Sequence, residues 1–133
     1  MTPYDLIGYA MAQTSTITSI VSTRIYHGDR PKGKTVPCIN FFELNTTRYM
    51  GMETSIYSIN CRANNSGQAR DLAREVINLF DGSSSNGVYG EFNGFSVARG
   101  SLQNDAGLVT EPTDNIYNAP IDIAIVYASA TVT

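Results

Sequence analysis

The sequence predicts an α+β domain. We expect a small antiparallel or mixed sheet of about four strands, with an amphipathic helix and an N-terminal helical segment packed on one face. The length of 133 residues is that of one ordinary domain, so residues 1–133 are treated as a single unit. Apolar residues recur at helical spacing over residues 68–80, whereas residues 53–63 alternate between apolar and polar. Short strands joined by loops favour an antiparallel sheet with its helices on one face.

The N-terminal segment is expected to be helical. Thr2 can cap a helix, Pro3 suits the first helical position, and Asp5 lies at the positive end of the helix dipole. The pattern breaks at residues 13–16, and a second short amphipathic helix leads to an extended segment at residues 24–26. The apolar residues at helical spacing are Leu6, Ile7, Ala10, Met11, Ile17, Ile20 and Val21.

Two strands are expected next. Residues 36–44 are rich in β-formers, and Pro37 stands near the start of this strand, where proline is tolerated. Its apolar residues fall on both faces, so we expect it to be covered on both sides. Residues 45–52 are expected to form a polar connection. Residues 53–63 are the clearest strand, with one buried and one wet face.

The strongest helix is expected over residues 68–80, after a cap at residues 65–67. Two further strands follow, at residues 92–99 and 120–128. Between them lies a long connection over residues 100–118. Long loops in so small a domain are often functional or ordered by partners.

The charge composition excludes a dedicated nucleic-acid binder. The net charge is −3 and the pI is near 4.9, and the sequence has no basic stripe. Charged residues make up only 16%, against about a quarter in typical domains. A polar, weakly charged surface suits a protein packed against copies of itself, although chance variation in composition explains the value equally well.

The sequence predicts an intracellular protein that does not enter a membrane. The N-terminus has no signal-peptide pattern, and no apolar run approaches the ~18 residues of a membrane span. Cys38 and Cys61 both lie in strand-like segments. They fit either buried free thiols or a disulfide, and the sequence does not show whether they are close in space.

Residues 28–35 match the phosphate-loop pattern letter for letter, from Gly28 to Thr35. Such a loop needs a helix that begins near Lys34, and its N-terminus would hold the phosphates. Here Val36 and Pro37 follow, and proline favours extended geometry in the residue before it. The pattern therefore predicts a flexible hairpin-like loop, with a small nucleotide-binding module as the alternative.

No catalytic, cofactor-binding or metal-binding residue is assigned. His27 is the only histidine and is expected in a solvated loop, no G-x-S-x-G elbow is present, and the carboxylates are scattered. Aromatic residues and methionine are favoured at protein contacts. Such residues in the polar connection either form an interface or pack against the sheet in the core. The candidate interface residues are Arg48, Tyr49, Met50, Met52, Tyr89, Phe92 and Tyr117.

The order of these segments resembles the tail-completion (tail-terminator) family of long-tailed bacteriophages across nearly the whole chain. One departure is Cys38, where a larger apolar residue is expected; the position still holds a hydrophobe. The resemblance rests on the N-terminal helical segment and the long last connection, and on Arg24-Ile25-Tyr26, Val36-Pro37-Cys38-Ile39, Tyr57 to Arg62, Ala69 to Phe80, Phe95 to Arg99, Asp105 and Gly107.

The resemblance implies a non-enzymatic virion protein, assembled in the host cytoplasm. It would form a hexameric ring on the tail tube, stop tube growth and dock to the head connector or head-closure protein. Six copies at −3 would carry roughly −18, so genomic DNA would pass through the lumen without specific binding. The alternatives are another neck or head-closure ring protein, a nucleotide-binding module through residues 28–35, and a monomeric binding module.

Overall fold

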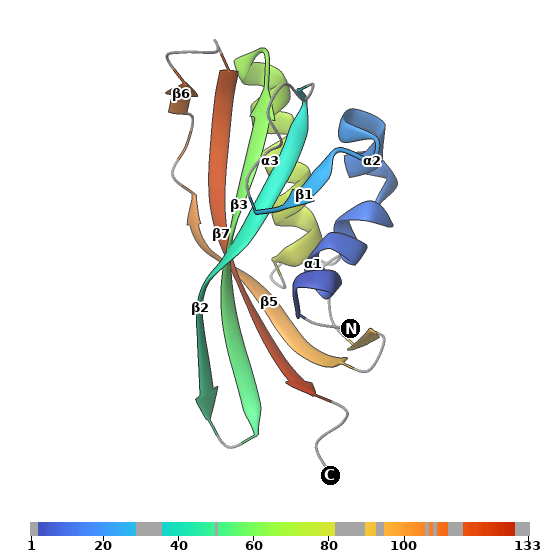
Figure 1. The fold of residues 1–133 in the computed structure, drawn as a ribbon, viewed down its shortest axis with the longest axis vertical. Helices are drawn as coiled ribbons and strands as arrows, with labels where there is room; N and C mark the ends of the chain where they lie inside the picture. Colours follow the sequence, from blue (N-terminus) through green and yellow to red (C-terminus); the bar gives the residue numbers. More distant parts are fainter. Residues whose placement is uncertain are drawn as a thin grey trace.

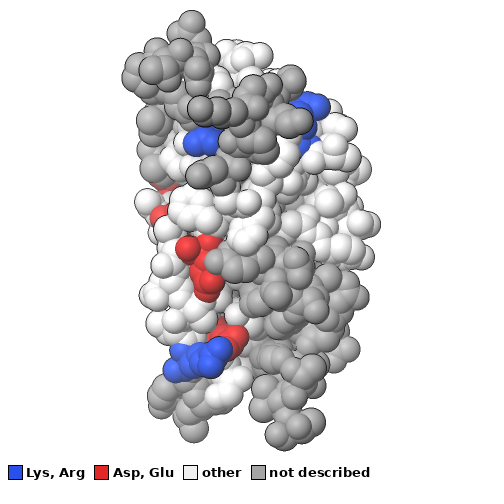
Figure 2. All heavy atoms as spheres, in the orientation of Figure 1, with Lys and Arg blue, Asp and Glu red and all other residues white. Residues whose placement is uncertain are grey.

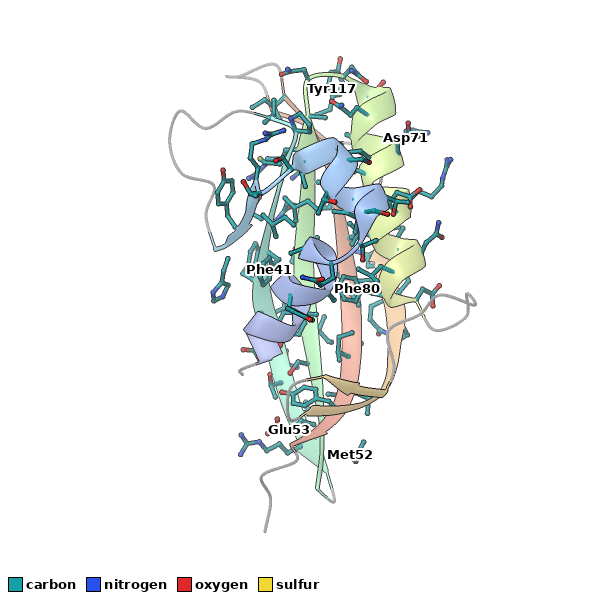
Figure 3. All side chains as sticks on the ribbon, turned by 90° about the vertical axis from the view of Figure 1, so that its right-hand side faces the viewer. Phe41, Met52, Glu53, Asp71, Phe80 and Tyr117 are labelled. Atoms are coloured by element: carbon teal, nitrogen blue, oxygen red, sulfur yellow. The ribbon has the colours of Figure 1, made fainter. Side chains whose placement is uncertain are left out.

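The protein folds into two layers, a twisted sheet and a layer of helices on one of its faces (Figure 1). Viewed from the helical side, the helices lie in front of the sheet (Figure 3). The α+β class and the one-sided arrangement predicted from the sequence are confirmed. This computed structural model describes residues 3–28, 36–49, 51–81, 90–92, 95–105, 107, 109–111 and 116–129.

The described residues form a seven-stranded mixed sheet in the order β1-β2-β3-β7-β5-β4, and β6 pairs with β7. The strands β1 and β2 run parallel, whereas every other described pair is antiparallel. Four strands are long, as predicted, and three are short. The elements are α1 Pro3–Ala12, α2 Ser15–Val21, β1 Ile25–His27, β2 Cys38–Tyr49, β3 Met52–Ala63, α3 Ser66–Phe80, β4 Gly90–Phe92, β5 Phe95–Asp105, β6 Val109–Glu111 and β7 Ile116–Ser129.

Helix α3 supplies the central part of the core. The Asn65 side chain accepts a hydrogen bond from the Gln68 backbone N–H at 2.8 Å, which caps the first turn as the sequence predicts. Burial of each large apolar side chain of its stripe contributes about 1.5–3 kcal/mol. The buried residues of α3 are Ala69, Leu72, Ala73, Val76 and Phe80.

The N-terminal helical segment is also confirmed. The two helices α1 and α2 are separated at Thr14, whose Oγ1 donates to the Ala10 carbonyl at 2.8 Å. Arg24 then joins α2 to the sheet, because its Nε donates to the Pro37 carbonyl at 2.8 Å and its own carbonyl accepts from Ile39 N–H at 2.9 Å. The start of β2 is therefore fixed beside β1.

Three of the strands are longer than the sequence predicts. Residues 45–49, expected in a polar connection, continue β2 and pair with β3 as far as Tyr49 opposite Met52. Strand β5 runs on to Asp105 and β7 already begins at Ile116, inside the long connection expected over residues 100–118. Polar Thr and Asn residues resemble turn residues in sequence but are tolerated in strands that face solvent.

The expected double cover of β2 holds for only part of the strand. Cys38 and Asn40 are buried on the face opposite to the core residues Ile39 and Phe41, whereas Phe42 and Leu44 further along are 38% and 52% exposed. The register of β2 against β3 also shifts between Glu43 and Asn45, which leaves Leu44 as an extra residue in the ladder.

The two cysteines are buried and do not form a disulfide. Cys38 pairs with Arg62, and Cys61 pairs with Ile39, so the thiols lie on adjacent strands but one position apart. Side chains alternate along a strand, and the two therefore point to opposite faces of the sheet. Burial raises the pKa of the Cys61 thiol well above its usual range.

Gly100 sets the distance between the sheet and the end of α3. A Cβ at this position would overlap the Phe80 carbonyl oxygen and lie 3.1 Å from Cδ1 of Ile125. The backbone of β5 can therefore approach the last turn of α3 only without a side chain here.

We expect Gly100→Ala to lower the free energy of unfolding by about 1–3 kcal/mol, because the helix and strand must move apart. Urea denaturation measures this change. Gly67→Ala is the matched control, since a Cβ there meets only Asn65 Oδ1 at 3.5 Å. A Gly100→Ala protein as stable as the wild type would contradict this account of the α3–β5 contact.

Candidate protein interface

The turn end of the β2–β3 hairpin extends beyond the helical layer, together with the C-terminal end of β7 (Figure 1). Strand β1 pairs only with residues 39–41 of β2. Residues 42–49 therefore have no neighbour on that edge among the described strands. A long unpaired edge of this kind can bind another chain by strand addition.

Three hydroxyl groups link the strands at this end of the sheet. Thr46 Oγ1 and Ser55 Oγ are 2.9 Å apart, and Ser55 Oγ and the Tyr127 hydroxyl are 3.1 Å apart. Ser55 and Tyr127 are both buried, and Tyr127 belongs to the hydrophobic core cluster. This chain of hydrogen bonds connects β2, β3 and β7.

The charges of the hairpin end lie beside this chain. Arg48 and Glu53 face each other across the turn and form an ion pair, and the Arg48 side chain is 80% exposed. Such a surface pair contributes about 0–1 kcal/mol. Figure 2 shows basic and acidic atoms side by side near the lower end of the molecule.

Burial raises the pKa of Tyr127 to about 12, and hydrogen bonding and charge from Glu53 act in the same direction. The hydrogen bond with Ser55 lowers the pKa and offsets part of this shift. The carboxylates of Glu53 and Glu43 therefore help to keep the hydroxyl protonated.

The sheet face opposite the helices, here called the open face, carries a polar row. Asn40 accepts a hydrogen bond from Arg62 Nη1 at 2.6 Å, and Asn60 accepts one from Asn118 Nδ2 at 3.0 Å. Asn40 lies directly opposite Asn60 on the neighbouring strand, and both are buried. Phe42 belongs to the same face, one alternate position further along β2.

The structure brings three of the predicted interface residues together. Arg48, Tyr49 and Met52 lie at the hairpin end, with Tyr49 opposite Met52 in the strand register. Met52 is half-buried, and Figure 3 shows it beside Glu53 at the lower end of the sheet. The side chain of Tyr49 and the whole of Met50 lie outside the described residues.

The other predicted residues lie elsewhere. Tyr117 is half-buried against the core and pairs with Ala63, at the opposite end of β3 from the hairpin turn (Figure 3). Phe92 is the last residue of β4, but its side chain lies outside the described residues, as does Tyr89. The predicted set is therefore spread over more than one part of the surface.

Sequence reasoning missed the exposed apolar residues of the described chain. These are Phe42 and Leu44 on β2 and Tyr9, 43% exposed, on α1. The apolar residues on both faces of segment 36–44 could have indicated this exposure. Such a strand is either covered on both faces or leaves apolar side chains exposed on one of them. Which of these outcomes occurs depends on how many helices can pack against the sheet.

The phosphate-loop pattern does not lead into a helix. Residues 29–35 lie outside the described residues, but Val36 and Pro37 bend directly into β2, which begins at Cys38. The strand predicted after the loop is confirmed. His27, expected in the loop, is instead the last residue of β1 and stacks on Phe41 with ring centroids 5.3 Å apart.

Within the described residues, no group of three or more His, Cys, Asp or Glu side chains could hold a metal ion. No helix in the described part of the chain is long and apolar enough to cross a membrane.

The comparisons with known proteins found a likeness in fold and none in sequence. No protein-family profile matches the chain, and no curated protein matches its sequence. Among solved structures, the chain is similar to a chain of the "Virion of native gene transfer agent (GTA) particle", with a TM-score of 0.63 and 10% sequence identity. The match covers 92% of each of the two chains, so the likeness in fold extends over nearly their full length.

The Tyr127 environment predicts how stability depends on pH. The folded pKa, about 12, exceeds the ordinary value of 10, so the folded state holds the proton more tightly than the unfolded state. This contribution is fully present below pH 10 and is lost as the pH rises towards 12. We expect the free energy of unfolding to decrease less steeply between pH 10 and 12 in Tyr127→Phe than in the wild type.

Urea denaturation at a series of pH values between 8 and 12 measures this slope. Tyr9→Phe, at an exposed site, controls for the loss of one tyrosine. A slope as steep in Tyr127→Phe as in the wild type would show that the hydroxyl is not the group responsible.

Proposed function

We propose that this chain is a structural virion protein that forms a ring at the head-proximal end of a phage tail. In this role it stops growth of the tail tube and joins the tail to the head. It acts through its shape and makes or breaks no covalent bond.

The observation that carries the proposal is the fold likeness over 92% of both chains to a chain of a gene transfer agent virion. At 10% identity this likeness concerns the fold, and the step to a virion role is our inference. The order of sequence segments that resembles tail-completion proteins supports the same role independently.

The surface suits a subunit that is completed by its neighbours. The unpaired edge at residues 42–49 and the exposed side chains of Phe42 and Leu44 would be covered in an assembly. In a ring each subunit contacts the next through two different surfaces, and closure of the ring ends growth in that direction. We propose that Arg48, Tyr49, Met50 and Met52 form part of one of these surfaces.

The proposed partners are further copies of the chain in a hexamer, the tail-tube protein and the head connector or head-closure protein. The net charge of −3 per copy gives an acidic ring overall. Such a ring lets DNA through without gripping it.

The direct test is to delete the gene from the producing strain and inspect particles by electron microscopy. We expect free filled heads and tails of abnormal length, and the purified protein should restore joining when it is added to the isolated parts. Binding to the end of purified tail tubes supports a tail terminator, whereas binding only to filled heads would favour a head-closure protein. Absence of the protein from mature particles would contradict the virion role.

A second experiment tests the hairpin end. Arg48→Ala with Met52→Ser should leave the melting temperature within a few degrees of the wild type, because both positions lie at the end of the sheet, away from the core. The same variant should enter particles several-fold less well in a complementation assay. Gln13→Ala, at an exposed position between α1 and α2, is the control. Equal incorporation of both variants would exclude the hairpin end from the interface.

A further inference from the structure

A groove of about 340 Å³ lies between α3 and the turn that follows β5. Arg70, Ala73, Arg74 and Ile77 line it from the helix. This part of α3 is marked by Asp71 in Figure 3, at the end of the sheet away from the hairpin turn. The groove is thus separate from the proposed hairpin interface.

The groove exists because the strand that pairs with β7 changes at this point. Pairing with β5 ends at Asp105 opposite Ile121, and pairing with β6 begins at Val109 opposite Asn118. Ala119 lies in the gap between them, which also explains how Pro120 is tolerated inside a long strand. The small residues Ala119, Ala73 and Gly107 leave the space open.

Asp105 and Gly107 are linked to each other beside the groove. The Asp105 carboxylate accepts a hydrogen bond from the Gly107 N–H at 3.0 Å, and Gly107 has a φ of +77°, which favours glycine. One carboxylate oxygen of Asp105 is therefore already hydrogen-bonded to Gly107.

The charged groups of the groove favour an anion. Arg70 and Arg74 are one helical turn apart, so their side chains are neighbours on the helix surface. Both are exposed, and neither forms an ion pair within the described part of the chain. The residues lining the groove therefore carry two positive charges and one negative charge, that of the Asp105 carboxylate.

We propose that this groove docks an acidic peptide segment of a partner protein. Guanidinium groups bind carboxylates in a bidentate manner, and the floor of Ala73, Ile77 and Ala119 accepts the aliphatic part of a side chain. The volume is at the small end of the range for binding pockets, which fits a short segment. The inference adds a second contact surface to the protein and does not depend on ring formation.

Two other occupants fit less well. A second copy is disfavoured because no two acidic residues are adjacent anywhere in the sequence, so the chain itself offers no strongly acidic segment to the groove. A nucleic-acid phosphate would gain nothing from the apolar floor of the groove, whereas the aliphatic part of an acidic side chain would contact it.

The test uses the full chain and the peptide acetyl-Leu-Glu-Glu-Leu-amide, with its Gln-Gln counterpart as the control ligand. At low salt we expect the acidic peptide to shift the NMR amide signals of Ala73, Gly107 and Ala119, with a Kd of about 0.1–1 mM that weakens as salt is added. Arg70→Gln with Arg74→Gln should weaken binding at least about tenfold. Asp105→Asn keeps the turn acceptor, removes the opposing charge and should tighten binding a few-fold.

Arg48→Gln removes a positive charge at the opposite end of the sheet and should leave peptide binding unchanged. The proposal is overturned if the Gln-Gln peptide or inorganic phosphate gives the same shifts. It also falls if an oligonucleotide binds the groove more tightly than the peptide, or if dilution of the protein alone moves these signals, which would identify a second copy as the occupant.

Discussion

The pairing of β3 with β7 is the constraint on which the rest of the molecule depends. These strands are paired from Glu53 opposite Tyr127 to Ala63 opposite Tyr117, at the centre of the sheet. Helix α3 lies across both of them and buries its apolar stripe there. Because β2 and β5 are added on either side, the register of this central pair sets which side chains reach the helices and which face outwards.

The one-sided cover of the sheet has a direct consequence for the surface. On the helical side, Ile59, Ile121 and Ile123 form a continuous apolar core. On the open face, Arg62 donates a hydrogen bond to Asn40 and Asn118 donates one to Asn60, so the side-chain oxygens of these two buried asparagines have partners. Phe42 and Leu44 remain exposed beyond this polar row.

The residues that bury apolar surface could be predicted from the sequence, whereas the ends of the strands could not. The stripe of α3 and the apolar alternation of residues 53–63 each have a period that one structure alone satisfies. The face of residues 53–63 expected to be wet is nevertheless partly buried, at Ser58 and Asn60. Residues 45–49 have no such period, because Asn45 to Arg48 are polar and exposed or half-buried, and the local composition resembles a turn. The extension of β2 there depends on cross-strand partners such as Ser55 and Tyr127, which are distant in sequence.

The same limit applies to the candidate surfaces. Arg48 and Met52 could be singled out from their neighbours in the chain, but their proximity to Tyr127 follows from the fold. The groove beside α3 depends on a change of strand partner at Ala119, and a single sequence carries no signal for such a change except the proline that follows it. Long-range pairing, rather than local propensity, therefore creates both surfaces.

The hydroxyl chain through Thr46, Ser55 and Tyr127 also affects how the hairpin end would bind. Association loses free energy through the ordering of flexible segments, and a rigid segment loses less. These side-chain hydrogen bonds already link the three strands in the single chain. In the proposed interface, a hairpin end held in this way would lose less conformational entropy on docking than a flexible one.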